Sequence, residues 1–245
     1  MLPKAVAFID YEHWYVSVKK NFGLRPDIKA WYDELSESVT LVDAFFFADF
    51  SHRSLADEIG RIRPFSNKII DTRNTNGNVT KDFTDFIILD NIYQKAIDSE
   101  DIDVFILFSG DGHFSSVCSF IKNKVGKELW VYGIRNSFSK QLQEIASRSC
   151  TLPTKKELKR RYNRVILDEI ALNEKNGVSS EREKILQSAS KKIKGNQDEI
   201  SRAMEELLVD GFLSERNILL SRKQRKKILF VDWSKVQCEG LIDDE

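Results

Sequence analysis

The stretch DVFILFSGDGH, from Asp103 to His113, decides the fold of this chain. Val104 to Phe108 is a short unbroken apolar run, which is typical of a strand buried on both faces of a sheet. Residues 114–125 follow helical periodicity, so the intervening residues 109–113 are predicted to form a strand-to-helix turn. Open α/β sheets bind their ligands at such turns. The two glycines of SGDGH permit a tight turn from which the Asp111 carboxylate projects.

A second stretch near the start of the chain has the same form. Ala5 to Ile9, AVAFI, is the first predicted strand, and Asp10 follows it directly. If the strands that end at Ile9 and Phe108 are neighbours, Asp10 and Asp111 meet above the carboxyl edge of one sheet. Two carboxylates so placed repel each other unless a cation lies between them, which favours a divalent metal held by oxygens. The alternative is that each Asp only caps the helix that follows it.

Strands and helices alternate through the first 153 residues. The patterns predict further strands at 41–48, 68–71 and 128–132, and helices at 11–22, 28–38, 51–63, 82–98 and 137–146. The segment 72–81, TRNTNGNVTK, is dense in turn formers and is predicted to be a loop over the same edge of the sheet. Such alternation indicates an α/β fold with a parallel sheet covered on both faces. The first domain is therefore expected to span residues 1–153.

The remaining residues, 154–245, predict a second, smaller α+β domain. Helices are expected at 158–172, 181–193 and 197–209, followed by short strands at 217–220 and 228–233. Three helices and a hairpin are typical of a winged helix. The segment joining the strands, SRKQRKK, is rich in cations that can reach phosphates, namely Arg222, Lys223, Arg225, Lys226 and Lys227. The alternative is a solvated turn in a protein-interaction module.

Composition indicates a protein of ordinary hydrophobicity without a membrane segment. The formal net charge of zero divides unevenly, because residues 1–153 carry 18 basic against 21 acidic side chains and residues 154–245 carry 20 against 17. A basic module beside an acidic one favours a polyanionic partner and a cation-dependent site. The start has too few apolar residues for a signal peptide, and three scattered cysteines do not form a disulfide framework. We expect a cytoplasmic protein that does not associate with membranes.

A third acid is expected to join the pair at the sheet edge. Asp85 lies near the start of the helix that precedes the strand 104–108. A helix that starts above the carboxyl edge would aim Asp85 at Asp10 and Asp111. Asp82 lies on nearly the same face of the helix and is the closer competitor, whereas Asp90 faces elsewhere.

Three blocks of the sequence resemble the NYN domains, a branch of the PIN-like nucleases. These blocks are FIDYEH at 8–13, KDFTDFIILD at 81–90 and SGDGHF at 109–114, within a resemblance that covers about residues 4–150. The resemblance implies a three-layer α/β/α sandwich with strand order 3-2-1-4-5, a cluster of acids that holds Mg²⁺ or Mn²⁺, and cleavage of RNA. It assigns the metal to Asp10, Asp85 and Asp111.

Two positions depart from the family pattern. His13 stands where the family usually has Asn, and His113 stands where it usually has a second Asp. Histidine binds manganese, iron or zinc more readily than magnesium, so these changes predict an altered metal preference. His113 is also a candidate general base and His13 a candidate phosphate-binding cation. The alternative is weaker metal binding and loss of cleavage.

The sequence therefore predicts a metal-dependent nuclease, with single-stranded RNA as the favoured substrate and DNA as the alternative. Asp10, Asp85, Asp111 and His113 are the candidate catalytic residues. Further candidates for substrate contacts are Ser109, Arg73 and Lys81, together with Tyr11 or Trp14 as stacking surfaces. The rival hypothesis is an inactive nucleic-acid-binding adaptor or regulator. An endoribonuclease is the favoured form of this enzyme, and the sequence leaves open both endo versus exo cutting and homo-oligomer formation.

Overall fold

The chain folds into two compact units. The computed structural model describes residues 2–73, 83–98, 100–193, 197–221 and 224–241. One unit contains Met1–Lys20 and Leu24–Leu152, and the other contains Asn21–Gly23 and Pro153–Glu245. Within the described ranges, no helix combines the length and the apolar character that crossing a membrane requires.

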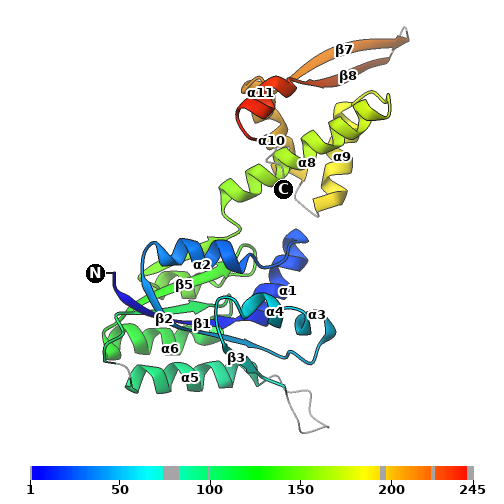
Figure 1. The fold of residues 1–245 in the computed structure, drawn as a ribbon. Helices are drawn as coiled ribbons and strands as arrows, with labels where there is room; N and C mark the ends of the chain where they lie inside the picture. The colour runs from blue at the N-terminus through cyan, green and yellow to red at the C-terminus, as the bar shows by residue number, and fades with distance from the viewer. Residues whose placement is uncertain (1, 74–82, 99, 194–196, 222–223, 242–245) are drawn as a thin grey trace. The chain divides into compact units, whose positions relative to one another are not determined.

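A six-stranded parallel sheet forms the centre of the first unit (Figure 1). Its order is β3-β2-β1-β4-β5-β6, which confirms the predicted order 3-2-1-4-5 and adds one strand. The strands are β1 (Lys4–Asp10), β2 (Thr40–Ala48), β3 (Lys68–Asp71), β4 (Val104–Phe108), β5 (Glu128–Ile134) and β6 (Arg148–Leu152). The prediction missed β6 because its sequence, RSCTL, has no apolar run. It is an edge strand that pairs only with β5 and is partly exposed along its length.

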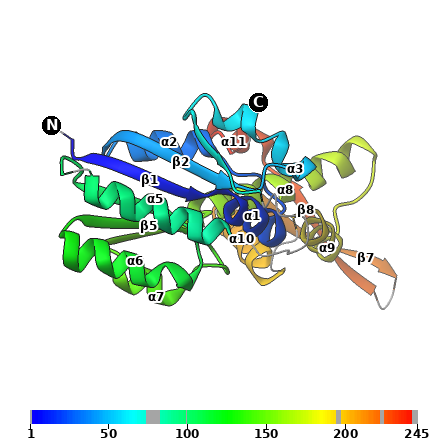
Figure 2. The same ribbon diagram turned by 90° about the horizontal axis from the view of Figure 1, so that it is seen from below.

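Helices cover both faces of this sheet (Figures 1 and 2). They are α1 (Tyr11–Phe22), α2 (Ile28–Ser36), α3 (Arg53–Ala56), α4 (Ile59–Ile62), α5 (Thr84–Asp98), η1 (Gly112–Phe114), α6 (Ser115–Phe120), η2 (Ile121–Val125) and α7 (Lys140–Ile145). The single helix predicted over 51–63 is wrong. Ser51 caps no helix there, because its hydroxyl donates to Asp49, and the segment folds as the two short helices α3 and α4.

Each face of the sheet has its own apolar core. On the face covered by α5, α6 and α7, side chains such as Phe8, Phe105 and Leu107 pack against the helices. On the opposite face an aromatic cluster joins α1 and α2 to the strands, with Trp14 stacked on Phe108 at 4.0 Å between ring centroids. Figure 2 shows α5, α6 and α7 on the near side of the sheet. The unit is therefore the three-layer α/β/α sandwich that the sequence predicts.

A buried carboxylate ties α1 to α4. The Glu58 side chain is fully buried and accepts hydrogen bonds from the Tyr11 hydroxyl at 2.6 Å, from Arg25 at 2.6 Å and from Arg61 at 2.7 Å. Burial raises the pKa of Glu58, but these partners outweigh burial and hold it below its ordinary value. Because Tyr11 follows Asp10 directly, this network also fixes the first turn of α1 beside the end of β1.

Replacement of Glu58 by Gln should lower the free energy of unfolding by about 3 kcal/mol at pH 7, because two arginines lose their buried counter-charge. A depressed pKa contributes stability above the unfolded pKa and loses it as pH falls through the folded pKa. The difference between the two proteins should therefore shrink below about pH 4. Urea unfolding at pH 7 and pH 3.5 measures it. The exposed neighbour variant Asp57→Asn serves as control, and an equal loss in both variants would contradict the assignment.

In the described residues, the second unit has four helices and a hairpin. Its elements are α8 (Lys155–Lys175), α9 (Arg182–Ile193), α10 (Gln197–Val209), β7 (Leu213–Ser221), β8 (Gln224–Val231) and α11 (Trp233–Cys238). Helix α8 begins three residues earlier than predicted because Thr154 and Glu157 form a capping box. Ile166, Ile185 and Met204, one from each of the first three helices, are fully buried in the core.

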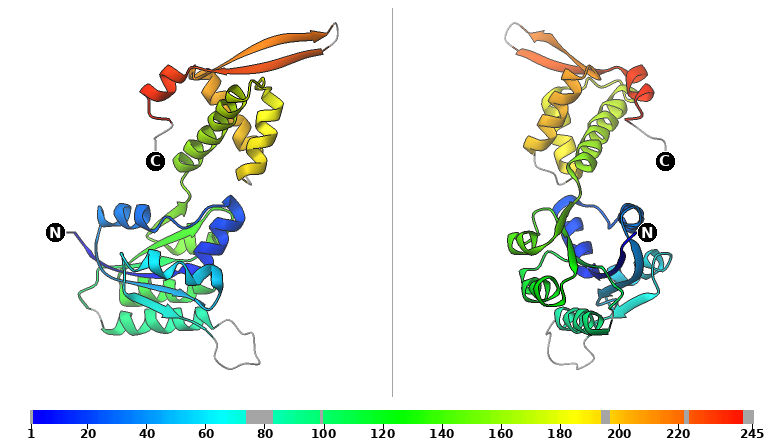
Figure 3. Two further views of the ribbon diagram at one scale, coloured as in Figure 1. Left: turned by 45° about the vertical axis from the view of Figure 1, so that its right-hand side comes forward. Right: turned by 90° about the vertical axis from the view of Figure 1, so that its left-hand side faces the viewer.

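The hairpin is longer than the sequence predicts. Strands β7 and β8 are antiparallel and extend beyond the helices of their own unit (Figure 3). Arg225, Lys226 and Lys227 were expected in the connecting segment, but they belong to β8. Lys226 pairs with Glu181 and Lys227 with Glu215, both at 2.8 Å. The remaining two basic candidates, Arg222 and Lys223, lie outside the described residues.

Candidate metal centre

The site begins where the two central strands end. Ile9 of β1 is paired with Phe108 of β4, so Asp10 and Ser109 emerge side by side at the carboxyl edge of the sheet. The buried Ser109 hydroxyl donates to Asp10 Oδ2 at 3.1 Å, and the backbone N–H of His13 donates to Oδ1 at 3.0 Å. Asp10 thus caps α1 and is also held by the neighbouring strand.

The Asp10 carboxyl has an unusual pKa. Burial raises it from an ordinary value of 3.8 to about 7, against the opposing effect of the bonds from His13 and Ser109. The negative charges of Asp85 and Glu12 contribute to this rise. A buried acid with a raised pKa, close to other acids, is a common feature of functional sites.

Asp111 occupies the turn that the sequence singles out. Its side chain accepts from the His113 backbone N–H at 2.9 Å and so caps η1. The turn requires Gly110, because a Cβ there would lie 1.8 Å from the backbone oxygen of Ser137. The Ser139 N–H donates to the Gly110 carbonyl at 2.9 Å. The segment after β5 therefore packs against the turn and stabilises its conformation.

Asp85 reaches the same edge from the first turn of α5. The buried hydroxyls of Thr72 and Thr84 are 2.7 Å apart and join the end of β3 to the start of this helix. Because Thr84 immediately precedes Asp85, this contact places the third acid. The α5 helix brings the Asp85 charge near enough to Asp10 to contribute to the raised pKa of that carboxyl, as expected of a helix that starts above this edge.

Asp85, Asp111 and His113 form a compact donor group. Each offers one ligand atom, and these atoms lie within 4.8 Å of one another. His113 Nδ1 lies 3.3 Å from Asp111 Oδ1 and 3.8 Å from Asp85 Oδ2. The predicted trio was Asp10, Asp85 and Asp111. The compact group contains His113 beside Asp85 and Asp111, whereas both oxygens of Asp10 accept hydrogen bonds, from Ser109 and His13.

The His13 side chain packs against the turn at Gly110. Its ring Nε2 would lie 2.6 Å from a Cβ at position 110, and its ring is hydrogen-bonded to the backbone of Ser137. Burial lowers its pKa, and this outweighs the attraction of Asp111. The lowered pKa disfavours the protonated imidazole that a phosphate-binding role for His13 would require.

Other predicted contacts are divided between the site and the core. Ser109 is fully buried and directs its hydroxyl to Asp10, so it positions a carboxylate. Tyr11 and Trp14 are also buried, which excludes them as stacking surfaces for a base. Lys81, like the competing Asp82, lies outside the described residues.

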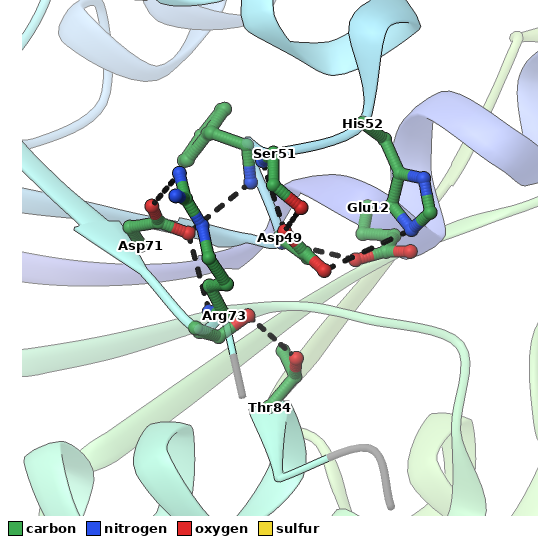
Figure 4. A network of polar contacts seen from close by, with 9 residues as sticks. Glu12, Asp49, Ser51, His52, Asp71, Arg73 and Thr84 are labelled. Carbon is green, nitrogen blue, oxygen red and sulfur yellow. Dashed lines mark hydrogen bonds and ion pairs between the residues drawn. The ribbon is translucent and has the colours of Figure 1, made fainter. Parts of the chain in front are cut away.

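A polar network continues along the edge to β3 (Figure 4). Glu12 accepts from the Asp49 N–H at 3.1 Å, and Asp49 in turn accepts from Ser51. Asp71 holds Arg73 at 2.9 Å and accepts from the Phe50 N–H at 3.3 Å. The three carboxylates of this network are not among the predicted site residues, although two of them directly follow or end a predicted strand. Each of these carboxylates forms hydrogen bonds or an ion pair with neighbouring residues, so the network stabilises the loops beside the metal-ligand candidates.

Comparison with known proteins places this architecture in a family. The family model of the NYN domain matches residues 4–153. The chain belongs to the NYN domain family. NYN domains generally have nuclease activity and typically use divalent metals, and the match includes all of the residues described above at the sheet edge. No curated protein matches the chain by sequence.

A solved structure shows the same fold. It is a protein of unknown function from Vibrio parahaemolyticus, which is 20% identical and superposes with a TM-score of 0.56. The similarity covers 62% of this chain and 93% of that chain. It extends the evidence for the fold of the NYN domain and carries no information about substrates.

The residues present fit a divalent cation. Two half-exposed carboxylates and an exposed imidazole converge, and carboxylate and imidazole together suit manganese or iron more than magnesium. The buried Asp10 adds a charge that is costly without a counter-ion. The NYN domain of this chain thus retains a donor set despite its departures from the family pattern.

Asp10→Asn should stabilise the metal-free protein at pH 8. A raised pKa contributes stability below the unfolded pKa and loses it as pH rises through about 7, so ionised Asp10 is destabilising at alkaline pH. The difference between 3.8 and about 7 corresponds to at most about 4 kcal/mol. Unfolding in EDTA should show a gain of about 2 kcal/mol at pH 8 and little change at pH 5. A gain that is the same at both values would contradict this origin.

Proposed function

We propose that this chain is a divalent-metal-dependent nuclease that hydrolyses phosphodiester bonds, with single-stranded RNA as its favoured substrate and an endonucleolytic mode of cutting. The observation that carries the proposal is the convergence of Asp85, Asp111 and His113 beside the buried Asp10, at the carboxyl edge of an NYN domain. The preference for RNA rests on the family alone.

Asp85, Asp111 and His113 would hold the cation. When bound, a divalent ion activates water and offsets the charge that develops on the phosphate. Asp10 would complete the negative field, and the Ser109 hydroxyl keeps its carboxylate in place. Gly110 and His13 keep the turn that carries Asp111 close to the segment after β5. These residues therefore divide into a donor group and a support that fixes its geometry.

We propose that the second unit is a winged helix. An isolated bridge joins Glu181, before α9, to Ile228 of β8, and the Leu229 N–H donates to the Ser180 carbonyl at 2.9 Å. A short strand between the first two helices that pairs with the hairpin is expected of that motif. We propose that this unit contributes affinity for nucleic acid through the basic segment at the hairpin.

Cleavage by the purified chain tests the activity directly. A circular single-stranded RNA should be opened in Mn²⁺ and left intact in EDTA, since an exonuclease cannot start on a circle. Asp111→Asn and Asp85→Asn should each lower the rate at least 100-fold, about 2.7 kcal/mol in activation free energy. Asp90→Asn, on the exposed face of the same helix, should cut normally. Intact circles with the wild-type protein would contradict the proposal.

His113 should determine the choice of metal. His113→Asp replaces the imidazole by a carboxylate and should raise the ratio of Mg²⁺- to Mn²⁺-supported activity about tenfold, roughly 1.4 kcal/mol. Mn²⁺ affinity, measured by electron paramagnetic resonance without substrate, should fall in the same variant. His52→Asp is the matched control, because His52 lies outside the donor group. An unchanged ratio would remove His113 from the ligands.

The basic segment should govern salt-dependent binding. In the triple variant Arg222→Gln, Lys223→Gln, Arg225→Gln, the slope of log affinity against log salt should fall by about 2, since each phosphate contact contributes about 0.7. Fluorescence anisotropy with single-stranded RNA and Ca²⁺ measures it. The double variant Lys226→Gln, Lys227→Gln should change the slope less, because both lysines already pair with glutamates. Equal effects would argue against this division.

The rival function is a nucleic-acid-binding adaptor without cleavage. Such an adaptor would share the nucleic-acid-binding properties predicted above, but it would not need a metal ion. An adaptor would bind RNA equally well in EDTA and in Mn²⁺, and Asp111→Asn would leave it unchanged.

A further inference from the structure

A cavity of about 410 Å³ lies beside the edge strand of the sheet, outside the donor group. It opens between β3, α4 and the loop after β2. Its lining is Phe50, Ile59, Arg63, Asn67, Ile69, Asp71 and Arg73. A volume of several hundred Å³ with an apolar wall and a few polar groups is typical of a pocket for a small organic unit.

The cavity lies on the same edge as the acids. Asp10 is in register with Phe47 of β2, and Phe47 is in register with Ile70 of β3. Asp71, which lines the cavity, is thus two strands from Asp10, a separation of about 10 Å across the sheet. A chain bound at the acids therefore needs only a short extension to reach the cavity.

The two arginines give the cavity its polarity. Arg73 is held by Asp71, which also fixes the Phe50 N–H at the cavity wall. Arg63 is exposed and forms no ion pair with any residue in the described part of the chain. One acid therefore faces two guanidinium groups, which leaves a formal charge of +1 for an anionic ligand.

The other lining groups suit the remainder of a nucleotide. The Phe50 side chain is 5% exposed, and Ile59 and Ile69 are partly buried, so they form an apolar wall. Asn67 is exposed and adds an amide that can both donate and accept. Guanidinium groups are suited to phosphate, and an apolar wall is suited to a sugar or the face of a base.

We propose that this cavity binds one nucleotide of the single-stranded substrate, with its phosphate on Arg63 and Arg73, away from the bond that is cut. The inference rests on the proposed nuclease function and adds a subsite to it. The subsite would hold the strand in a fixed position relative to the donor group and would favour substrates longer than the reach between the two places.

The test compares Arg63→Gln with Lys124→Gln in the full chain, because Lys124 is an exposed cation on η2, which packs on the other face of the sheet. Arg63→Gln should raise KM for a 12-nucleotide RNA about tenfold and leave hydrolysis of bis(p-nitrophenyl) phosphate unchanged, since that small diester cannot span the distance. Lys124→Gln should change neither. Equal loss on both substrates, or no difference between the two variants, would overturn the subsite.

A second readout does not depend on cleavage. The 12-nucleotide RNA with 4-thiouridine at each position in turn is crosslinked to the Asp111→Asn protein, and the adducts are located by mass spectrometry. At least one position should label the peptide that contains Phe50, and Arg63→Gln in the same background should reduce that adduct. Labelling without any cutting by wild type would reject the nuclease and keep the subsite. Absence of this adduct would reject the subsite even if RNA is cut.

Discussion

The close approach of acidic side chains at the ends of β1, β4 and α5 is the constraint on which the rest of the domain depends. Burial is the main cause that raises the pKa of Asp10 to about 7, and the charge of Asp85 adds to the rise. The surrounding structure is organised to maintain this approach. Ser109 donates a hydrogen bond to Asp10, and the contact between Thr72 and Thr84 positions Asp85. The close backbone approach at Gly110 fixes the turn that carries Asp111. A cation is the simplest partner for such an arrangement.

Helix capping, which the sequence presents as the alternative to metal binding, is present at both Asp10 and Asp111. Asp10 accepts from the N–H of His13 and Asp111 from that of His113, so each caps the segment that follows it. Capping restricts the side-chain rotamer of each Asp. It thereby fixes the direction in which the remaining lone pairs point, which is useful for a ligand that must be positioned before the cation arrives. The same interactions therefore serve local stability and the geometry of the site.

Much of the fold was predictable because it depends on patterns that are local in sequence. Buried strands such as β4 are unbroken apolar runs, and the order of the central five strands follows from the family resemblance that their flanking motifs carry. Strand β6 was not predictable, since its stability comes from pairing with β5. The roles of His13 and His113 were also open, because one is decided by burial beneath Gly110 and the other by the tertiary approach of α5.

The polar network of Figure 4 follows the same sheet edge, and two of its residues, Asp71 and Arg73, line the cavity beside β3. Diffraction from crystals soaked in Mn²⁺, recorded at the manganese absorption edge, tests the central claim most directly. The account predicts an anomalous peak within bonding distance of Asp85, Asp111 and His113, about 2 Å from each ligand atom. A peak confined to the Glu12, Asp49 and Asp71 carboxylates, or no peak at this edge, would contradict it.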